Sequence, residues 1–298
     1  MIKVNNVDKS FKHIKALSSL SMNVKIGSIY GLVGTNGSGK TTLLKHIAGI
    51  FMPDSGEIYV DGIPAGDSQH LGERVFFFPD ELYFFGNYSL SDMERLYRRL
   101  YRSWNRDRFD RLTEMLSLSR EVKISRFSKG VQKQAMFALG MSTMPDVLLL
   151  DEPVDGLDPI VRRIVWDFIV SDVAEREMTV LISSHNLREI EGICDTVGIL
   201  SGGTMVLERD LDDLRSSVHK VQTAFRERPD NPYKGLNVLS SSASGSVDMM
   251  IIKNTAEEIE EALAPHSPLI LDLLPLTLEE VFIYELGGEH NEYKDILE

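Results

Sequence analysis

The most specific pattern in this 298-residue chain is Gly34-Thr-Asn-Gly-Ser-Gly-Lys-Thr41. It satisfies the pattern G-x-x-x-x-G-K-S/T, in which glycines let backbone N–H groups turn inward around phosphate oxygens. A nearly continuous apolar run over 28–33 precedes it, and residues 41–50 are apolar at helical spacing. A strand, a glycine-rich turn and a helix in this order predict a phosphate-binding loop. We therefore expect the chain to bind a nucleoside triphosphate.

Two positions of this loop have specific roles in the chemistry. Lys40 is expected to reach the β- and γ-phosphates and to take part in catalysis, and the Thr41 hydroxyl is expected to bind Mg²⁺. The helix that follows adds the positive end of its dipole. The residues that we assign to nucleotide binding are Gly34, Thr35, Asn36, Gly37, Ser38, Gly39, Lys40, Thr41 and Thr42.

Two carboxylates follow an apolar strand-like run over 147–150, 111 residues after Lys40. Asp151 is suited to hold Mg²⁺ through water, and Glu152 to polarise the attacking water as a catalytic residue. An acidic pair at a strand end can also be purely structural. The phosphate loop earlier in the chain favours the catalytic interpretation.

Composition and charge limit the class of protein. Hydrophobic residues make up 43% and charged residues 26%, which indicates a globular chain of about two domains. With 32 Lys and Arg against 45 Asp and Glu, the net charge of −13 disfavours nucleic-acid binding through a broad basic surface. The single cysteine, Cys194, excludes an internal disulfide. No apolar stretch approaches the ~20 residues of a membrane span, and no secretory signal is seen, so we expect a soluble cytoplasmic protein.

The apolar patterns predict an α/β arrangement, because apolar strands that alternate with helices indicate a mainly parallel sheet covered on both faces. The expected elements are β structure over 1–33, helix over 41–50, a strand over 75–78, mostly helix over 89–143, strands over 146–150 and 178–183 around a helix over 160–174, and a hairpin over 197–207. Beyond about residue 215 we expect a small α+β unit, 216–298, whose role is open between regulation and an extra dimer contact. In it, 240–246 is predicted to be a flexible loop between strand-like runs over 236–239 and 247–252, and the T-x-x-E patterns at Thr255 and Thr277 are predicted to open helices.

Three further motifs resemble those of the ATP-binding cassette (ABC) ATPases. Phe127-Ser-Lys-Gly-Val-Gln-Lys-Gln134 resembles the family's signature motif, Asp155-Gly-Leu-Asp158 its D-loop, and Ser184-His185 its switch histidine. The order and spacing match over residues 1 to about 210, roughly 70% of the chain. The implied fold is α/β: a P-loop NTPase core with a mixed, mainly parallel sheet, an N-terminal antiparallel β subdomain and a helical subdomain inserted at about 85–143. This nucleotide-binding domain would span 1–215 and precede the α+β appendage.

The resemblance implies that two such domains pack head to tail, each closing the other's site. Ser128 and the Gly130 amide would contact the γ-phosphate bound at Lys40 of the partner subunit. His185 would touch the γ-phosphate and act in catalysis, the alternative being a solvent-facing histidine. Asp158 would link the two sites, the alternative being a turn aspartate before a proline.

Other positions match the family less directly. Phe11 is expected to stack on adenine, although it can also be a strand residue that packs on the sheet. Asp80 replaces the family's usual glutamine and is expected to touch Mg²⁺ or its water, with a purely structural role as the alternative. Lys129 and Val131 replace a usual glycine and glutamine of the signature, while its two γ-phosphate contacts remain.

The resemblance also bears on partners. In this family the helical subdomain receives a coupling helix from a membrane subunit, so a run of arginines there suits an acidic partner surface or anionic lipid, the alternative being a solvated helix face. These arginines are Arg95, Arg98, Arg99, Arg102, Arg106, Arg108 and Arg111. Stacking of nucleic acid on the nearby Tyr97, Tyr101 and Trp104 is disfavoured.

The leading hypothesis is an ATP-hydrolysing, Mg²⁺-dependent subunit that powers an ABC transporter and resembles the bacterial ABC-2 or drug-exporter group. The style of the signature and D-loop suggests this group, and 277–284 is similar to its terminal helix. The expected partners are separate membrane-spanning subunits and a second nucleotide-binding subunit, identical or related, with no nucleic acid. The protein would then lie on the inner face of the membrane. The alternatives are a soluble ABC ATPase that acts on a protein complex, and a regulator that uses ATP as a switch.

Overall fold

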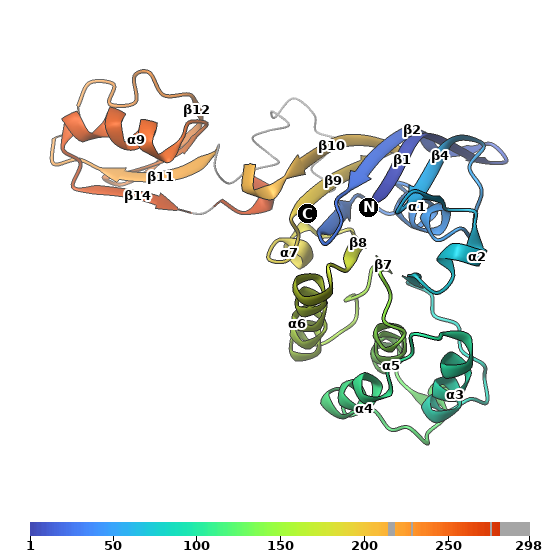
Figure 1. Ribbon diagram of the computed structural model, residues 1–298. Coiled ribbons are helices and arrows are strands. Elements are labelled where there is room, and N and C mark those ends of the chain that lie inside the picture. Colours follow the sequence, from blue (N-terminus) through green and yellow to red (C-terminus); the bar gives the residue numbers. More distant parts are fainter. Residues whose placement is uncertain (214–217, 228, 275, 281–298) are drawn as a thin grey trace. The chain divides into compact units, whose positions relative to one another are not determined.

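The computed structural model describes residues 1–213, 218–227, 229–274 and 276–280 (Figure 1). The chain divides into two compact units, Met1–Glu208 and Arg209–Glu298. The sequence placed the boundary at 215/216. That the two units act as separate domains stays a prediction.

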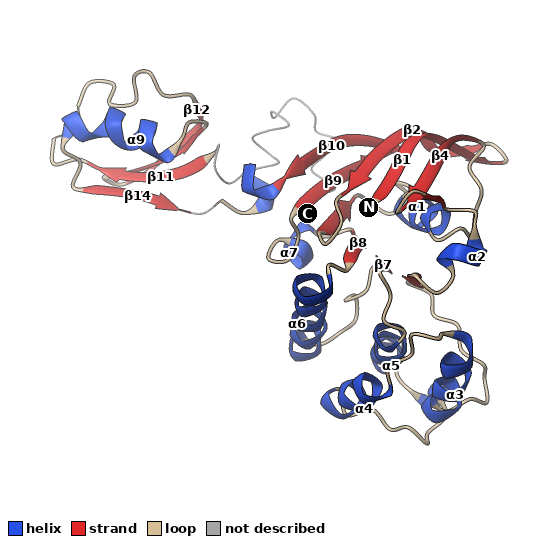
Figure 2. Ribbon diagram, viewed as in Figure 1, coloured by secondary structure: helices blue, strands red, loops and turns tan. Residues whose placement is uncertain are grey.

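A six-stranded sheet forms the centre of the N-terminal unit (Figure 2). Its strands, in spatial order, are β10 (Thr204–Asp210), β9 (Thr196–Ser201), β3 (Ile29–Val33), β8 (Thr179–Ser184), β7 (Val147–Asp151) and β6 (Val75–Phe78). The five strands from β9 to β6 are parallel. Every residue of β3, β7 and β8 is buried, which explains their apolar sequences. The mainly parallel sheet predicted from these runs is confirmed.

A second sheet, antiparallel, carries the N-terminus. Its strands are β2 (Ile14–Val24), β1 (Ile2–Phe11), β4 (Ser55–Val60) and β5 (Ile63–Pro64). Helix α1 (Lys40–Ile47) buries Leu43, Leu44 and Ile47 in a core that includes residues of both sheets. This packing fixes the first turn of α1 just beyond the end of β3.

The segment between β6 and β7 is mostly helical, as expected, and its helices lie together in Figure 1. Ser89 and Asp92 form a capping box at the start of α3. The hydrogen bond from the Ser89 amide lowers the pKa of the Asp92 carboxyl. The helices of this unit other than α1 are α2 (Ser68–Leu71), α3 (Leu90–Leu100), α4 (Arg106–Met115), α5 (Lys129–Ser142), α6 (Pro159–Arg176) and α7 (Leu187–Ile190).

The described part of the C-terminal unit contains a four-stranded antiparallel sheet with a helix packed on it. The strands, in spatial order, are β12 (Val238–Ser244), β13 (Val247–Ile252), β11 (His219–Ala224) and β14 (Ile270–Leu274). Helix α9 (Ala256–Leu263) begins at the predicted Thr255 cap and buries Ile259 and Leu263 against the sheet. The sequence patterns missed β11 and β14.

The prediction of a flexible loop over 240–246 is wrong. Residues 240–244 belong to β12, and they pair with β13 up to Ser244 opposite Val247. Gly245, at a φ of 64°, closes the tight turn between the two strands. The serines satisfy strand geometry on an exposed edge, and backbone pairing overrides their low strand preference. Of the helix expected at 277–284, residues 278–280 are helical and 281–284 lie outside the described residues.

Within the described ranges, no helix has the length and apolar character needed to cross a bilayer.

Candidate nucleotide-binding site

The predicted phosphate loop, the Asp151–Glu152 pair and His185 meet at the carboxyl ends of three neighbouring strands. The glycine-rich loop follows β3, Asp151 ends β7, and His185 follows β8. Because β3 and β7 pair in parallel with the two sides of β8, these three ends lie side by side. Open parallel sheets bind ligands at this edge.

The loop after β3 folds around the ammonium group of Lys40, a buried residue. The Lys40 Nζ donates to the carbonyl oxygens of Gly34 (2.6 Å) and Thr35 (3.3 Å). Gly39, just before α1, has a φ of 111°, and a Cβ there would lie 2.6 Å from the Ala16 carbonyl oxygen. Only glycine fits this position. The lysine is therefore held within its own loop, at the N-terminus of a helix suited to phosphate.

Ser183 of β8 orients both members of the carboxylate pair. Its hydroxyl donates to Asp151 Oδ1 at 2.6 Å, while the Glu152 N–H lies 3.2 Å from both the carbonyl oxygen and the hydroxyl of Ser183. Asp151 is almost fully buried. Ser183 was not among the predicted site residues, although a hydroxyl residue in a buried apolar strand needs a hydrogen-bond partner and so points to such a role.

The side chain of Glu152 lies between Lys40 and His185. Its Oε1 is 3.5 Å from Lys40 Nζ and its Oε2 is 2.9 Å from His185 Nδ1. The His185 N–H also donates to Oε2 at 3.3 Å. Oε1 is buried and has no hydrogen-bond partner among the described residues. A carboxylate held this way has one oxygen oriented by the histidine and one directed toward the phosphate-binding lysine.

The donors at this edge fit Mg²⁺ only in part. Asp151 supplies a buried carboxylate, and Thr41 supplies an exposed hydroxyl at the start of α1. The described residues contain no group of three or more His, Cys, Asp and Glu that could hold a metal ion by themselves. Mg²⁺ commonly binds through one or two protein ligands plus water and substrate phosphates, which matches such a sparse donor set. Thr41 and Asp151 therefore fit a magnesium ion that the nucleotide completes.

Asp80 lies in the loop after β6, and the cation beside it is Lys133 of α5. Its Oδ1 is 3.1 Å from Lys133 Nζ, which also donates to the backbone carbonyl of Glu152 at 2.8 Å. Lys133 is buried, whereas the Asp80 side chain is half exposed. The predicted contact of Asp80 with Mg²⁺ stays a prediction. No sequence pattern pointed to Lys133.

The signature residues form a second cluster with the D-loop. Ser128 is exposed and caps α5 by accepting a hydrogen bond from the Val131 N–H at 3.3 Å. A Cβ on Gly130 would lie 3.0 Å from the Gly156 carbonyl oxygen, so a side chain there would press on the D-loop. Ser128 and Lys129 at the start of α5 are thus exposed, and Gly130 adjoins Gly156 and Leu157 of the D-loop.

Asp158 has a local task that the structure shows directly. It caps α6, because its Oδ1 accepts hydrogen bonds from Ile160 (3.1 Å) and Val161 (3.0 Å). This is the turn-aspartate alternative. A role across a dimer stays a prediction.

A pair of substitutions separates these two tasks. Asp158→Ala removes the cap and is expected to lower the free energy of unfolding by about 0.5–2 kcal/mol, whereas Asp158→Asn caps equally well and is expected to be neutral. Urea melts measure both. If Asp158→Asn keeps both stability and the rate of ATP hydrolysis, the cap accounts for Asp158. A stable Asp158→Asn variant with altered hydrolysis would require the role across the dimer.

Phe11 lies near the loop, at the end of β1 opposite Ile14. Its ring is 40% exposed and meets Phe51 edge to face at a centroid distance of 5.4 Å. The carbonyl of Ala16, two residues beyond Ile14, is the one that adjoins Gly39. An exposed ring this close to the loop is compatible with stacking on adenine. That role of Phe11 stays a prediction.

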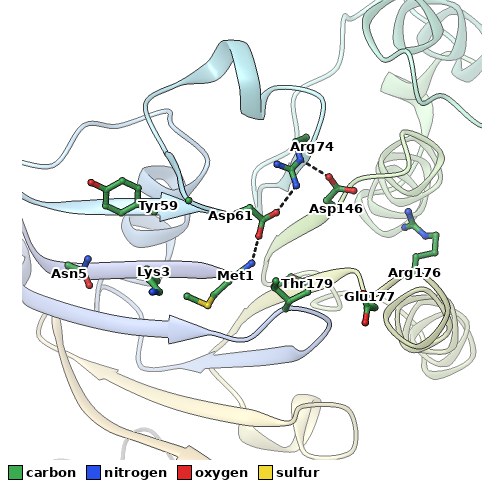
Figure 3. A pocket seen from close by; sticks show the side chains of 12 residues that line it. Met1, Lys3, Asn5, Tyr59, Asp61, Arg74, Asp146, Arg176, Glu177 and Thr179 are labelled. Atoms are coloured by element: carbon green, nitrogen blue, oxygen red, sulfur yellow. Dashed lines mark hydrogen bonds and ion pairs between the residues drawn. The ribbon is translucent and has the colours of Figure 1, made fainter.

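A separate cavity of about 920 Å³ lies at the opposite ends of the strands (Figure 3). Asp146 and Thr179, which line it, adjoin the amino ends of β7 and β8. Arg74 contacts both Asp61 and Asp146 at 2.7 Å, and the chain's amino group also pairs with Asp61. These charges satisfy one another, and we assign no site to this cavity.

A glycine-rich loop surrounds Lys40 after β3, and an Asp-Glu pair lies at the end of β7, with β8 between these two strands. This combination defines a P-loop nucleoside triphosphatase. Comparison with known proteins narrows the class. Residues 17–155 match the family model described as ABC transporter. The chain is 31% identical over 289 residues to the ABC transporter ATP-binding protein YtrB of Bacillus subtilis, covering 97% of this chain and 99% of YtrB. It is 31% identical over 223 residues to the bacitracin transport ATP-binding protein BcrA of Bacillus licheniformis, covering 74% and 73%.

Solved structures agree with the sequence comparison. An ATP-binding subunit of an ABC transporter matches with a TM-score of 0.67 at 25% identity, covering 72% of this chain and 92% of that one. The cassette MJ0796, solved as a dimer with ADP and phosphate, matches with a TM-score of 0.64 at 24% identity, covering 71% and 99%. The chain belongs to the ABC transporter ATP-binding proteins. It is an ATP-binding and ATP-hydrolysing subunit of that family, and the P-loop NTPase fold predicted from the motifs is confirmed.

Proposed function

We propose that this subunit powers export by a membrane-spanning partner, through Mg²⁺-dependent ATP hydrolysis in a head-to-tail dimer. The observation that carries the proposal is the position of Glu152 between Lys40 and His185. This arrangement joins a phosphate-binding cation, a base and a histidine at one strand edge. A binding-only regulator would not need the base.

Each residue of the site has a defined task in hydrolysis. Lys40 exchanges its loop carbonyls for phosphate oxygens when ATP binds, and this exchange releases Glu152 Oε1 to orient water and accept its proton. His185 holds Oε2, and Ser183 fixes the backbone of Glu152. When bound, Mg²⁺ neutralises charge that develops on the phosphates, and Thr41 and Asp151 would hold it.

A second copy of the chain completes the site. Ser128 is exposed at the start of α5, where free helical N–H groups favour an anion. It belongs to the cluster bordered by the D-loop, not to the network around Lys40. In an isologous dimer each copy offers this cluster to the other, which yields two equivalent sites.

An exposed aromatic patch suits the membrane partner. Tyr83, Phe85 and Tyr88, in the loop between β6 and α3, are 77%, 46% and 38% exposed. Their ring centroids are 6.0 and 4.9 Å apart in sequence order. Contiguous exposed apolar surface of this kind marks an interaction site. An apolar helix of the partner is a suitable occupant.

The arginines of the helical segment give weaker support for docking of the membrane partner than the aromatic patch does. Five of the seven contact side chains of the same chain: Arg95 with Asp92, Arg102 with Glu73, Arg106 with Asp110, Arg108 with Asp172, and Arg111 with the ring of Phe168. Tyr97, Tyr101 and Trp104 likewise pack on one another. The three aromatic rings are therefore used within the subunit, whereas the side chains of Arg95, Arg102 and Arg106 remain 68%, 93% and 67% exposed.

Export is the proposed direction, because a relative from Burkholderia orbicola, 30% identical over 213 residues, is described as a Nod factor export ATP-binding protein, and because the motifs resemble the drug-exporter group. In this proposal the subunit lies on the inner face of the membrane through its partner. The transported molecule is selected by that partner.

Purification of the tagged chain from detergent-solubilised native membranes tests the proposal. We expect a multi-spanning protein in stoichiometric amount, and we expect the double variant Tyr83→Ser, Phe85→Ser to lose it while binding ATP as the wild type does. Tyr59→Ser, on the antiparallel sheet, is the matched control. Only soluble partners beside an active ATPase would favour the soluble ABC ATPase instead. Retention of the membrane protein by the double variant would reject the aromatic patch.

A further inference from the structure

Lys133 joins the loop of Asp80 to the catalytic carboxylate through a single ammonium group. Its Nζ donates to the Glu152 carbonyl oxygen at 2.8 Å and to Asp80 Oδ1 at 3.1 Å. The three residues come from different elements: the loop after β6, helix α5, and the end of β7. The Lys133 side chain is 9% exposed, so its ammonium group is largely shielded from water, whereas the Asp80 side chain is 49% exposed.

The backbone of Glu152 needs such a restraint. Its φ is 47°, a left-handed conformation that costs a non-glycine residue energy unless neighbours hold it. On the amino side, the Glu152 N–H is held by Ser183. On the carboxyl side, the carbonyl is held by Lys133. The two hydrogen bonds fix both peptide planes that set the direction of the Glu152 side chain.

We propose that Lys133 is a positioning residue for hydrolysis, which holds Glu152 through its carbonyl and makes that hold depend on Asp80. Asp80 neutralises a buried cation that would otherwise be costly. When the Asp80 loop moves, Lys133 loses its counter-charge, and its hydrogen bond to the Glu152 carbonyl oxygen weakens. Asp80 thus acts on catalysis through Lys133, in place of the direct contact with Mg²⁺ predicted from the sequence.

The inference deepens the proposed function and rests on its ATPase step. The main variant is Lys133→Met, which removes the donor and keeps an unbranched side chain. We expect kcat to fall roughly ten- to hundredfold, with KM for ATP within about twofold of the wild type, because positioning and not nucleotide binding is lost. Lys133→Arg keeps a donor and is expected to retain more activity than Lys133→Met.

The role of Asp80 is tested by Asp80→Asn, which is half exposed and is expected to fold. We expect it to lower kcat by several-fold in the wild-type background and to have little further effect in the Lys133→Met background. The Mg²⁺ concentration for half-maximal rate is expected to stay unchanged. An additive effect, or a raised Mg²⁺ requirement, would overturn the proposal and restore Asp80 as a metal contact.

Controls separate positioning from packing. Lys220→Gln removes a partly buried Lys–Glu pair with Glu280 in the C-terminal unit and is expected to leave kcat unchanged. If Lys133→Met and Lys133→Arg lose activity equally and both melt at lower temperature, Lys133 is a packing residue and the proposal fails. A Lys133→Met variant with wild-type kcat overturns it as well. A wild-type protein that hydrolyses no ATP, alone or with its membrane partner, would instead reject the proposed function.

Discussion

Replacement of Glu152 by glutamine will lower kcat for ATP by about 10²- to 10⁴-fold, the loss typical of a missing general base. Glutamine keeps the shape of the side chain, and its amide accepts no proton from water at neutral pH. The side chain at position 152 loses its negative charge while Lys40 keeps its positive charge. The lysine therefore still binds phosphate, and nucleotide binding is expected to persist. The bound ATP then remains uncleaved, and light scattering with MgATP is expected to show a stable dimer.

Glu189→Gln is the matched control for this experiment. The side chains of Glu152 and Glu189 are equally exposed, at 12% each, and Glu189 also faces a cation, Arg162 at 3.7 Å. We expect Glu189→Gln to keep most of the wild-type rate. Hydrolysis by Glu152→Gln within about tenfold of the wild type would mean that another group accepts the proton. A Glu152→Gln protein that stays monomeric with MgATP, alone and with its membrane partner, would reject the head-to-tail dimer.

The local parts of the site could be predicted from the sequence because each is encoded by a short stretch. A strand, a glycine-rich turn and a helix are contiguous in the phosphate loop, and Asp151 and Glu152 directly follow their strand. The parallel order of β3, β8 and β7 then brings these stretches together. A pattern of buried apolar strands was sufficient to predict that sheet.

The supporting residues could not be found in this way, because their roles arise from tertiary contacts. Lys133 acts on Glu152, 19 residues away, and on Asp80, 53 residues away. Neither separation follows a helical or strand period. Asp158 is the opposite case, because its role in the structure is local. It caps α6, which the sequence suggested only as an alternative to a role across the dimer. Most of strand β12 was predicted as a loop, because pairing with β13, and not composition, determines its conformation.

Replacement of Lys40 by alanine is expected to weaken ATP binding by about 30- to 1,000-fold, or roughly 2–4 kcal/mol. The ammonium group is the cation at the centre of the loop, where the carbonyls of Gly34 and Thr35 hold it. Without it, the phosphates would face those carbonyls and the carboxylate of Glu152 with no compensating charge. The loss is therefore larger than that of an exposed salt bridge.

Titration with a fluorescent ATP analogue, together with ligand-induced shifts in melting temperature, measures the effect. Lys45→Ala is the matched control, because Lys45 lies in the last turn of the same helix and contacts the ring of Phe51. We expect it to bind ATP nearly as the wild type does. Equal affinities for Lys40→Ala and the wild type would show that the loop amides alone hold the phosphates. Because Lys40 also lies 3.5 Å from Glu152, an intermediate loss of affinity with an undetectable kcat would show that the lysine serves both binding and hydrolysis.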